Sequence, residues 1–269
     1  MGGLTNDLGA DLTYLSLCGG VQSTALLICS ALGWHDVPRA DVAIWSDVGC
    51  EAVWTYQAID MLREWSPIPI VKVSAGHSMT EHPRLEVPPP VFTRNRDGSV
   101  GMANRQCTRE YKIRPIEREV RRRMGYRPRQ VVKKLAAALI GISWEERQRA
   151  KLSSTRWVVN IYPFVEGQLT RDDCRRIIER AGLTVPGKSS CVCCPYHGDD
   201  YWRVLKERDP AGWEEACRYD EHIRSQRSIK GGAYLHRSLR PLREIDFGED
   251  TQLSLWDAHP PVCEGMCGL

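Results

Sequence analysis

The chain has 269 residues, 42% of them hydrophobic and 26% charged, which is enough to bury the core of one large α/β domain. No apolar run reaches the length of a membrane span and residues 1–11 lack the pattern of a secretory signal, so we expect a cytoplasmic protein that neither spans nor binds a membrane. Eleven cysteines in a reducing compartment indicate metal, cluster or redox chemistry rather than a disulfide framework.

The first elements read as a strand, a tight turn and a helix. Apolar residues from Leu12 to Leu17 predict a strand, and the run from Thr24 to Leu32 favours a helix. Between them, Gly19 and Gly20 allow positive φ and close approach of a ligand. The amides that open the helix carry partial positive charge, so the turn predicts a phosphate or sulfate site. Gly-Gly turns without a bound anion are also common in α/β proteins.

The alternation of strands and helices continues after the first helix. Residues 41–46 predict a second strand that ends at Asp47, residues 52–65 a helix, and residues 68–73 a third strand. This βαβαβ order predicts a parallel sheet, and ligands bind such sheets at the carboxyl ends of the strands. Asp47 is therefore expected to face a ribose, a metal or the substrate. The composition of residues 74–102, which is rich in Pro, Gly and His, predicts a long segment without regular structure that passes over this edge.

The second half of the chain adds similar elements. Apolar runs at 135–143 and 158–164 predict two further strands. A helix from Thr170 to Ala181 starts with a capping-box pattern, because an acid, Asp173, stands three residues after Thr170.

The predicted fold class is α/β, a parallel, twisted, Rossmann-like sheet with helices on both faces. We assign residues 1–200 to this nucleotide-binding domain. Residues 201–269 form a helical extension, helical over 201–227, that ends in a mobile tail containing Cys263 and Cys267.

A basic segment extends from Arg109 to Lys134. It holds eleven Lys and Arg residues against three acids and includes a helix after Pro115. A basic stripe of this kind can hold a nucleic-acid backbone through phosphate contacts. A solvated helix face accounts for the same residues, so a polyanionic partner is one of two interpretations.

Collinear motifs over residues 12–205 resemble a known family, the PP-loop ATP pyrophosphatases and the phosphoadenosine phosphosulfate (PAPS) reductases. Its members share an adenine nucleotide α-hydrolase-like fold. The motifs are Cys18-Gly19-Gly20-Val21-Gln22-Ser23, Asp47-Val48-Gly49, Cys107-Thr108 with Lys112 and Pro115, Gly141-Ile142-Ser143 with Glu145 and Arg149, Tyr162-Pro163, and Ser190-Cys191 with Cys194.

Two departures leave the reaction open. ATP pyrophosphatases usually carry Ser and Asp where this chain has Cys18 and Gln22, and a Gln there is similar to the sulfonucleotide reductases. Those reductases end in a Glu-Cys-Gly-His type tail, which the segment from Cys263 to Cys267 resembles only loosely. Fold-level analogy does not decide between sulfur transfer after adenylation and sulfate reduction.

The resemblance implies roles for individual residues. Lys112, Asp47, Cys263 and Cys267 are the expected catalytic residues. ATP, with Mg²⁺, is expected to bind through Ser16, Cys18, Gly19, Gly20, Gln22, Ser23, Asp47 and Gly141. The implied partners are a nucleotide, a nucleic-acid or nucleotide substrate, and a sulfur donor protein, and the chain is expected to form a homodimer.

The Cys-x-x-Cys pair Cys191 and Cys194 has the spacing of soft thiolate ligands, which select zinc or an iron–sulfur cluster. Resemblance to cluster-bearing thiolation enzymes favours a 4Fe-4S cluster held by Cys107, Cys191 and Cys194, with one iron open. A structural zinc site, and thiols that are catalytic or merely buried, are the alternatives. Core packing is expected for Cys29, Cys50, Cys174 and Cys217.

The sequence therefore predicts an ATP pyrophosphatase that adenylates a nucleic acid or nucleotide for iron–sulfur-dependent sulfur transfer. A thiol-dependent PAPS reductase is the alternative enzyme. A nucleotide- and metal-binding subunit of a modification complex is the alternative without catalysis.

Overall fold

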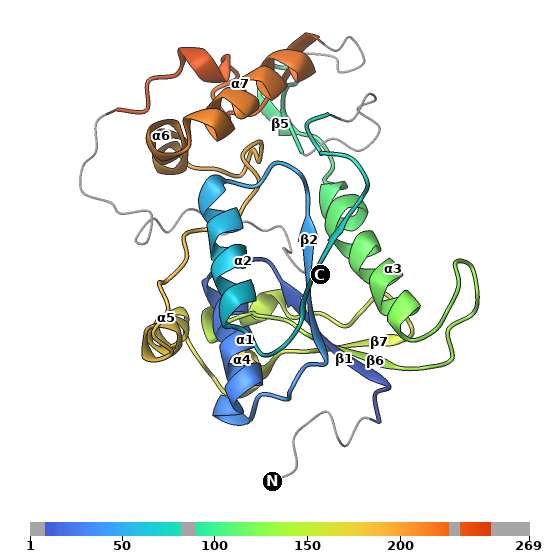
Figure 1. Ribbon diagram of the computed structural model, residues 1–269. Helices are drawn as coiled ribbons and strands as arrows, with labels where there is room; N and C mark the ends of the chain where they lie inside the picture. Colours follow the sequence, from blue (N-terminus) through green and yellow to red (C-terminus); the bar gives the residue numbers. More distant parts are fainter. Residues whose placement is uncertain (1–8, 82–89, 226–231, 249–269) are drawn as a thin grey trace.

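The computed structural model describes residues 9–81, 90–225 and 232–248. A parallel five-stranded sheet forms its centre, in the order β3-β2-β1-β6-β7 (Figure 1). The strands are β1 (Leu12–Leu17), β2 (Val42–Asp47), β3 (Ile70–Ser74), β6 (Ala136–Leu139) and β7 (Val158–Ile161).

Helices cover both faces of this sheet, as Figure 1 shows. One face carries α1 (Val21–Leu32), α2 (Val53–Trp65), α4 (Pro163–Glu166) and α5 (Arg171–Arg180), and the other carries α3 (Arg114–Arg123). The predicted α/β class with a parallel sheet and helices on both faces is confirmed. None of the helices in the described part of the chain is long and apolar enough to cross a membrane.

The two-residue period of the strands builds the two halves of the core. In β1, Leu15 and Leu17 pack against α1, α2 and α5, whereas Tyr14 packs toward α3. Helix α1 is buried on nearly every side, with Leu26 and Leu27 fully buried, because it lies between the sheet and α5. This packing fixes the start of α1 against the carboxyl end of β1.

The strand order reverses between β1 and β6. From β1 the chain proceeds outward to β2 and β3, and it later returns to the other side of β1 through β6 and β7. In open parallel sheets the loops on the two sides of such a reversal diverge, and ligands bind in the crevice between them. The glycine turn after β1 and the segment after β6 therefore flank the expected site.

A second layer lies above the carboxyl edge. It contains α6 (Asp199–Arg208), α7 (Pro210–Ser225) and a small antiparallel sheet of β4 (Phe92–Arg94), β5 (Val100–Met102) and β8 (Ala233–Tyr234). Its core, around Trp202 and Trp213, also contains Val48 and Tyr111 from the sheet-bearing part of the chain. The division into residues 1–200 and 201–269 stays a prediction.

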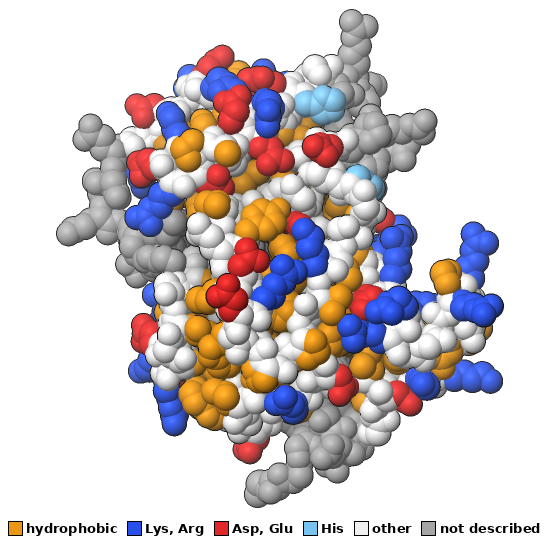
Figure 2. Space-filling view, in the orientation of Figure 1, with side chains coloured by type: hydrophobic (Ala, Val, Ile, Leu, Met, Phe, Trp, Pro, Cys, Tyr) orange, Lys and Arg blue, Asp and Glu red, His pale blue; other side chains and the backbone are white. Residues whose placement is uncertain are grey.

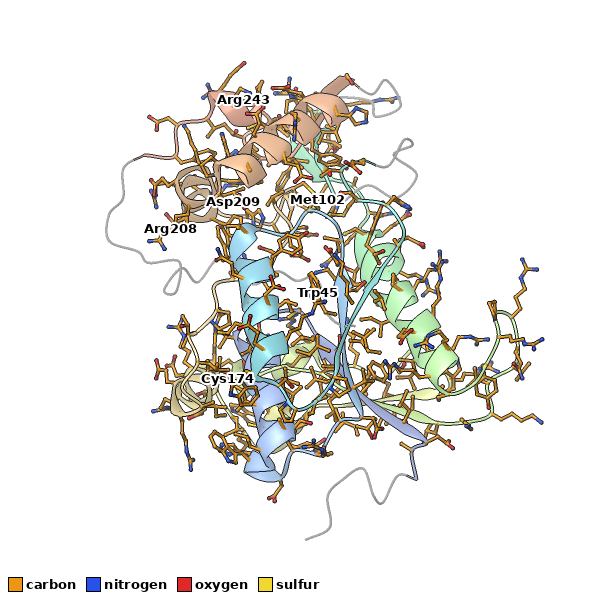
Figure 3. The ribbon with its side chains drawn as sticks, in the orientation of Figure 1. Trp45, Met102, Cys174, Arg208, Asp209 and Arg243 are labelled. Carbon is orange, nitrogen blue, oxygen red and sulfur yellow. The ribbon has the colours of Figure 1, made fainter. Side chains whose placement is uncertain are left out.

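One buried carboxylate joins this layer to α2. Asp209, between α6 and α7, lies at the end of α2 in Figure 3 and accepts a 2.9 Å hydrogen bond from the Val53 amide. The Gly212 amide donates to its other oxygen at 2.9 Å. A carboxylate on the first free amides of a helix stabilises the helix start, so the layer and the sheet hold each other in place.

Several predicted boundaries are wrong for local reasons. Residues 92–94 and 100–102 pair as a hairpin inside the expected structureless excursion, because β8, far away in sequence, supplies a third strand. The predicted strand at 158–164 stops at Ile161, since Pro163 starts helix α4. A π-helical segment, η2 (Thr108–Ile113), directly precedes α3, so the helical region begins before Pro115.

Candidate active site at the carboxyl edge of the sheet

The turn after β1 has the predicted backbone. Gly19 has φ of 76°, a conformation that favours glycine, and α1 begins directly after Gly20. The first turn of α1 carries no acidic residue and no side-chain cap. Its amides, which have no carbonyl partner within the helix, therefore offer a positive pole without a competing carboxylate.

The side chains of the turn brace it from inside. The Ser23 hydroxyl accepts a hydrogen bond from the Cys18 amide at 3.3 Å and donates to the Gly20 carbonyl at 3.2 Å. Its oxygen lies 3.1 Å from the Cys18 sulfur. The expected hydroxyl donor thus holds the shape of the turn, which leaves the backbone amides as the predicted anion ligands.

Later segments of the chain contact the same turn. Gln22 donates a 3.1 Å hydrogen bond to Glu146, whose other oxygen pairs with Arg149 at 2.7 Å. Ser189 donates to the Cys18 carbonyl. The neutral Gln22 amide therefore serves as the link between α1 and the segment after β6.

Gly141, two residues after the end of β6, touches the backbone of α1. A Cβ atom at Gly141 would lie 2.9 Å from both the Gln22 carbonyl carbon and the Ser23 nitrogen. Only glycine permits this approach without a backbone shift. The two loops at the strand reversal are thus in contact at the helix start.

A cavity of about 430 Å³ opens beside these loops on the α3 face of the sheet. Helix α3 packs over β1, β2 and β3, so the part of this face at β6 and β7 is left to the loop 151–155. The wall combines the strand side chains with cationic and hydroxyl groups: Tyr14, Ser16, Asn160, Arg105, Thr108, Arg109, Lys112, Lys151, Ser153, Ser154 and Thr155. The same wall also carries apolar side chains and the acid Glu117, and the size of the cavity suits a nucleotide.

Lys112 lies where three hollows meet. It borders the large cavity, a niche beside Ser16 and Cys18, and a third cavity lined by cysteines. Its amine pairs at 3.3 Å with Glu51, a carboxylate whose side chain is 1% exposed. The second Glu51 oxygen is buried without a hydrogen-bond partner among the described residues. Sequence reasoning predicted Lys112 as a site residue but missed Glu51, because nothing in the sequence distinguishes this acid from others that follow a strand.

The structure gives Asp47 three partners within the protein. Its carboxylate accepts hydrogen bonds from the Gly49 amide at 2.8 Å and the Tyr56 hydroxyl at 3.1 Å, and pairs with Lys72 at 2.5 Å. These contacts fix the turn after β2 and hold β3 beside it. The expected role toward ribose, metal or substrate stays a prediction.

The three predicted metal ligands surround one cavity. Cys107, Cys191 and Cys194 all line a hollow of about 50 Å³, together with Arg105 and Lys188. Cys107 precedes η2, and the other two lie in the turn that leads to α6. Residues about 85 positions apart in the printed numbering thus line one cavity, and their role as metal ligands stays a prediction.

Two further thiols lie behind this cavity. Cys50 and Cys193 are buried, and their sulfur atoms are 3.6 Å apart. The hydrogen bond with Cys191, followed by burial, raises the pKa of Cys193 well above its usual value. For Cys191, hydrogen bonds with Cys193 and Cys194 lower the pKa, but the hydrogen bond with Cys50 and burial outweigh them and raise it to about 11. Cys50, expected to be a packing residue, therefore belongs to the thiol group.

The wall of the cysteine cavity also holds buried polar atoms without a partner among the described residues. They are Thr108 Oγ1, Tyr111 OH, Ser190 Oγ and His197 Nδ1. Folded proteins leave few such atoms, and a concentration of them at one cavity indicates a bound group. Three thiols and three hydroxyl donors fit a metal–sulfur group, whose sulfides accept hydrogen bonds.

The thiols are not arranged as metal ligands in this conformation. Among the described residues, no group of three His, Cys, Asp or Glu side chains could hold a metal ion as placed. The donor chemistry fits a metal centre, but binding a metal would require the thiols to move from the positions they have here. Cys263 and Cys267, the two predicted tail residues, lie outside the described residues.

Comparisons with known proteins bear on the fold. No family model matches the chain, and no curated protein matches it significantly in sequence. Among solved structures, a phosphate complex of the phosphoadenylyl-sulfate (PAPS) reductase from Candida auris matches with 13% identity and a TM-score of 0.41, over 66% of this chain and 77% of that chain. The U34-tRNA thiolase NcsA from Methanococcus maripaludis, with its 4Fe-4S cluster, matches with 16% identity and a TM-score of 0.42, over 84% and 78%.

Proposed function

We propose that the chain is an ATP pyrophosphatase that adenylates an oxygen of a nucleic acid or nucleotide and then replaces that oxygen with sulfur. The observation that carries this proposal is the position of Lys112, which borders the large cavity, the niche beside Cys18 and the cysteine cavity. One cation thus lies between the anion-binding turn, a nucleotide-sized space and the thiols.

The proposed reaction begins with cleavage between the α and β phosphates of ATP. The amides at the start of α1 would bind the phosphates, and Lys112 would neutralise charge that develops on the α-phosphate and on pyrophosphate. Mg²⁺ would accompany the triphosphate. The substrate oxygen attacks the α-phosphate, pyrophosphate leaves, and the activated carbon or phosphorus then accepts a sulfur nucleophile while AMP leaves.

The cysteine cavity is the proposed source of that sulfur. Cys107, Cys191 and Cys194 would hold the metal centre, and a 4Fe-4S cluster bound there supplies an iron that can carry sulfur. Thr108 and Lys112 border both this cavity and the large one. These two side chains would orient the adenylated substrate toward the thiols.

A basic surface around the connection from α3 to β6 favours a nucleic-acid substrate. The connection between α3 and β6, residues 124–135, projects from the molecule, and Lys and Arg side chains gather around it (Figures 1 and 2). Arg122 and Arg123 both pair with Glu119, which offsets one of their two positive charges. Arg127 and Arg129 are exposed in the projection, where phosphate contacts would hold a strand that extends beyond the cavity.

The test is a product assay on anaerobically purified protein. With ATP labelled at the α-phosphate and a nucleic-acid substrate present, we expect AMP and pyrophosphate. Lys112→Ala should abolish both products, whereas Lys206→Ala, which removes an exposed cation from α6, should not. Sulfite from PAPS, without pyrophosphate from ATP, would contradict the proposal and identify a sulfonucleotide reductase.

A further inference from the structure

His197 is a buried side chain of the cysteine cavity that the sequence pattern did not single out. It stands in the order Cys191-x-x-Cys194-x-x-His197, just before α6. Its residue exposure is 7%, and it lines the same hollow as Cys107, Cys191 and Cys194. The cavity is therefore bordered by three thiols and one imidazole.

The hydrogen bond of one ring nitrogen fixes the chemistry of the other. His197 Nε2 lies 2.8 Å from the carbonyl oxygen of Cys191. A carbonyl only accepts, so Nε2 carries the proton and the neutral ring presents an unprotonated Nδ1. This nitrogen is buried and has no hydrogen-bond partner among the described residues. One residue that lines the cysteine cavity thus has a buried imidazole nitrogen with an unused lone pair.

Packing prevents the ring from turning away. The ring stacks on Tyr201 with centroids 3.6 Å apart and planes 13° from parallel. Trp202 meets it edge-on at 4.8 Å. An imidazole whose second nitrogen donates to a backbone carbonyl is the usual arrangement of a metal-bound histidine, because the hydrogen bond sets both tautomer and orientation.

We propose that His197 Nδ1 is the fourth protein ligand of the metal centre, which completes a Cys3His donor set with Cys107, Cys191 and Cys194. This inference rests on the metal centre of the proposed function and adds a nitrogen ligand to it. Three sulfurs and one imidazole suit a cluster with one distinct iron and also suit a tetrahedral zinc. In a cluster, the imidazole would occupy the iron that three cysteines leave open, and it would have to leave that iron before sulfur could bind there. On binding, each thiol releases a proton to solvent, whereas the neutral imidazole binds through its lone pair without proton loss.

One substitution separates ligation from packing. Gln at position 197 places an amide nitrogen close to the position of Nε2, so it retains a donor for the Cys191 carbonyl while it removes Nδ1. A matched control is His236→Gln, because His236 is equally buried but engages both nitrogens, with Ser238 at 2.8 Å and Asp199 at 3.1 Å. The control tests whether loss of any buried histidine disturbs the centre.

The experiment reconstitutes the full chain anaerobically with ferrous iron and sulfide, after labelling of histidine with ¹⁵N, and records pulsed EPR of the reduced centre. A second arm titrates the apoprotein with Co²⁺ and follows its visible absorption, which reports a single-ion site. We expect a directly bonded histidine nitrogen in the wild type and in His236→Gln. His197→Gln should lose this coupling and bind the metal at least about tenfold more weakly.

A centre without a bonded nitrogen, or equal metal affinity and spectra in His197→Gln, would overturn the inference. Failure of the wild type to take up iron–sulfide or cobalt would overturn it as well. Pyrophosphate release from ATP by the same preparation would still support the adenylating function. Conversely, a nitrogen-bound centre without pyrophosphate release would support the ligand and contradict the proposed reaction.

Discussion

Gly141→Ala tests the contact between the two loops at the strand reversal. The added methyl carbon would lie 2.9 Å from two backbone atoms of α1 and 3.0 Å from a third, the Gln22 oxygen. Backbone cannot swing aside as a long side chain can, so the first turn of α1 has to shift. Overpacking of this kind costs about 1–3 kcal/mol of unfolding free energy. The shift also displaces the amides proposed to bind phosphate, and we expect ATP affinity to fall about tenfold or more.

The assay is equilibrium denaturation of both proteins in urea, together with calorimetric titration of a non-hydrolysable ATP analogue. Gly198→Ala is the matched control, because a Cβ there meets nothing within 4 Å. Alanine is a poorer N-cap residue than glycine, but it also reduces the conformational entropy of the unfolded chain, so these two effects on the free energy of unfolding should nearly cancel. If Gly141→Ala keeps both the stability and the affinity of the parent, the two loops do not constrain each other and the reasoning fails.

Two other predictions concern stability. The capping box of α5 should make Thr170→Ala about 1 kcal/mol less stable than the parent. Hydrogen bonds from Thr170 lower the pKa of Asp173, so the stability that Asp173 contributes is present above its ordinary pKa of 3.8 and is lost as the pH falls through the lowered pKa of the folded state. Asp173→Asn should therefore be less stable than the parent near neutral pH and equally stable in acid. A difference in denaturation midpoints that does not change with pH would contradict this. Lys112→Met should lower the free energy of unfolding by about 3 kcal/mol, because it leaves Glu51 buried without its cation. The double variant with Glu51→Gln should recover most of that loss. Additive losses in the two single variants and the double variant would show that the pair is not coupled.

Local patterns predicted the sheet and its glycine turn. The apolar alternation in Leu12–Leu17 and the glycines after it determine a strand and a turn through contacts close in sequence. The capping box at Thr170 was predicted for the same reason, since both partners lie within one helical turn. Boundaries such as the helix start at Pro163 were missed where a short element interrupts an apolar run.

The rest of the site depends on contacts between distant segments. Cys50 meets Cys193 across 143 positions, and Lys112 meets Glu51 across 61, so neither pair leaves a spacing pattern that a single sequence reveals. His197 stands three residues after Cys194, and this spacing is the one feature of the sequence that could have indicated a further ligand beside the cysteines. Its tautomer, however, follows from the Cys191 carbonyl, whose direction only the folded turn defines.

The central claim is that the nucleotide binds where the loop after β1 meets the loop after β6, beside the cysteine cavity. A crystal structure of the full chain with an ATP analogue that cannot be cleaved between the α and β phosphates tests it most directly. We expect the phosphates at the amides that open α1, next to Lys112, and the nucleoside in the cavity lined by Ser16 and Asn160. A triphosphate bound elsewhere, for example along Arg127 and Arg129, with the start of α1 free of ligand, would contradict the account.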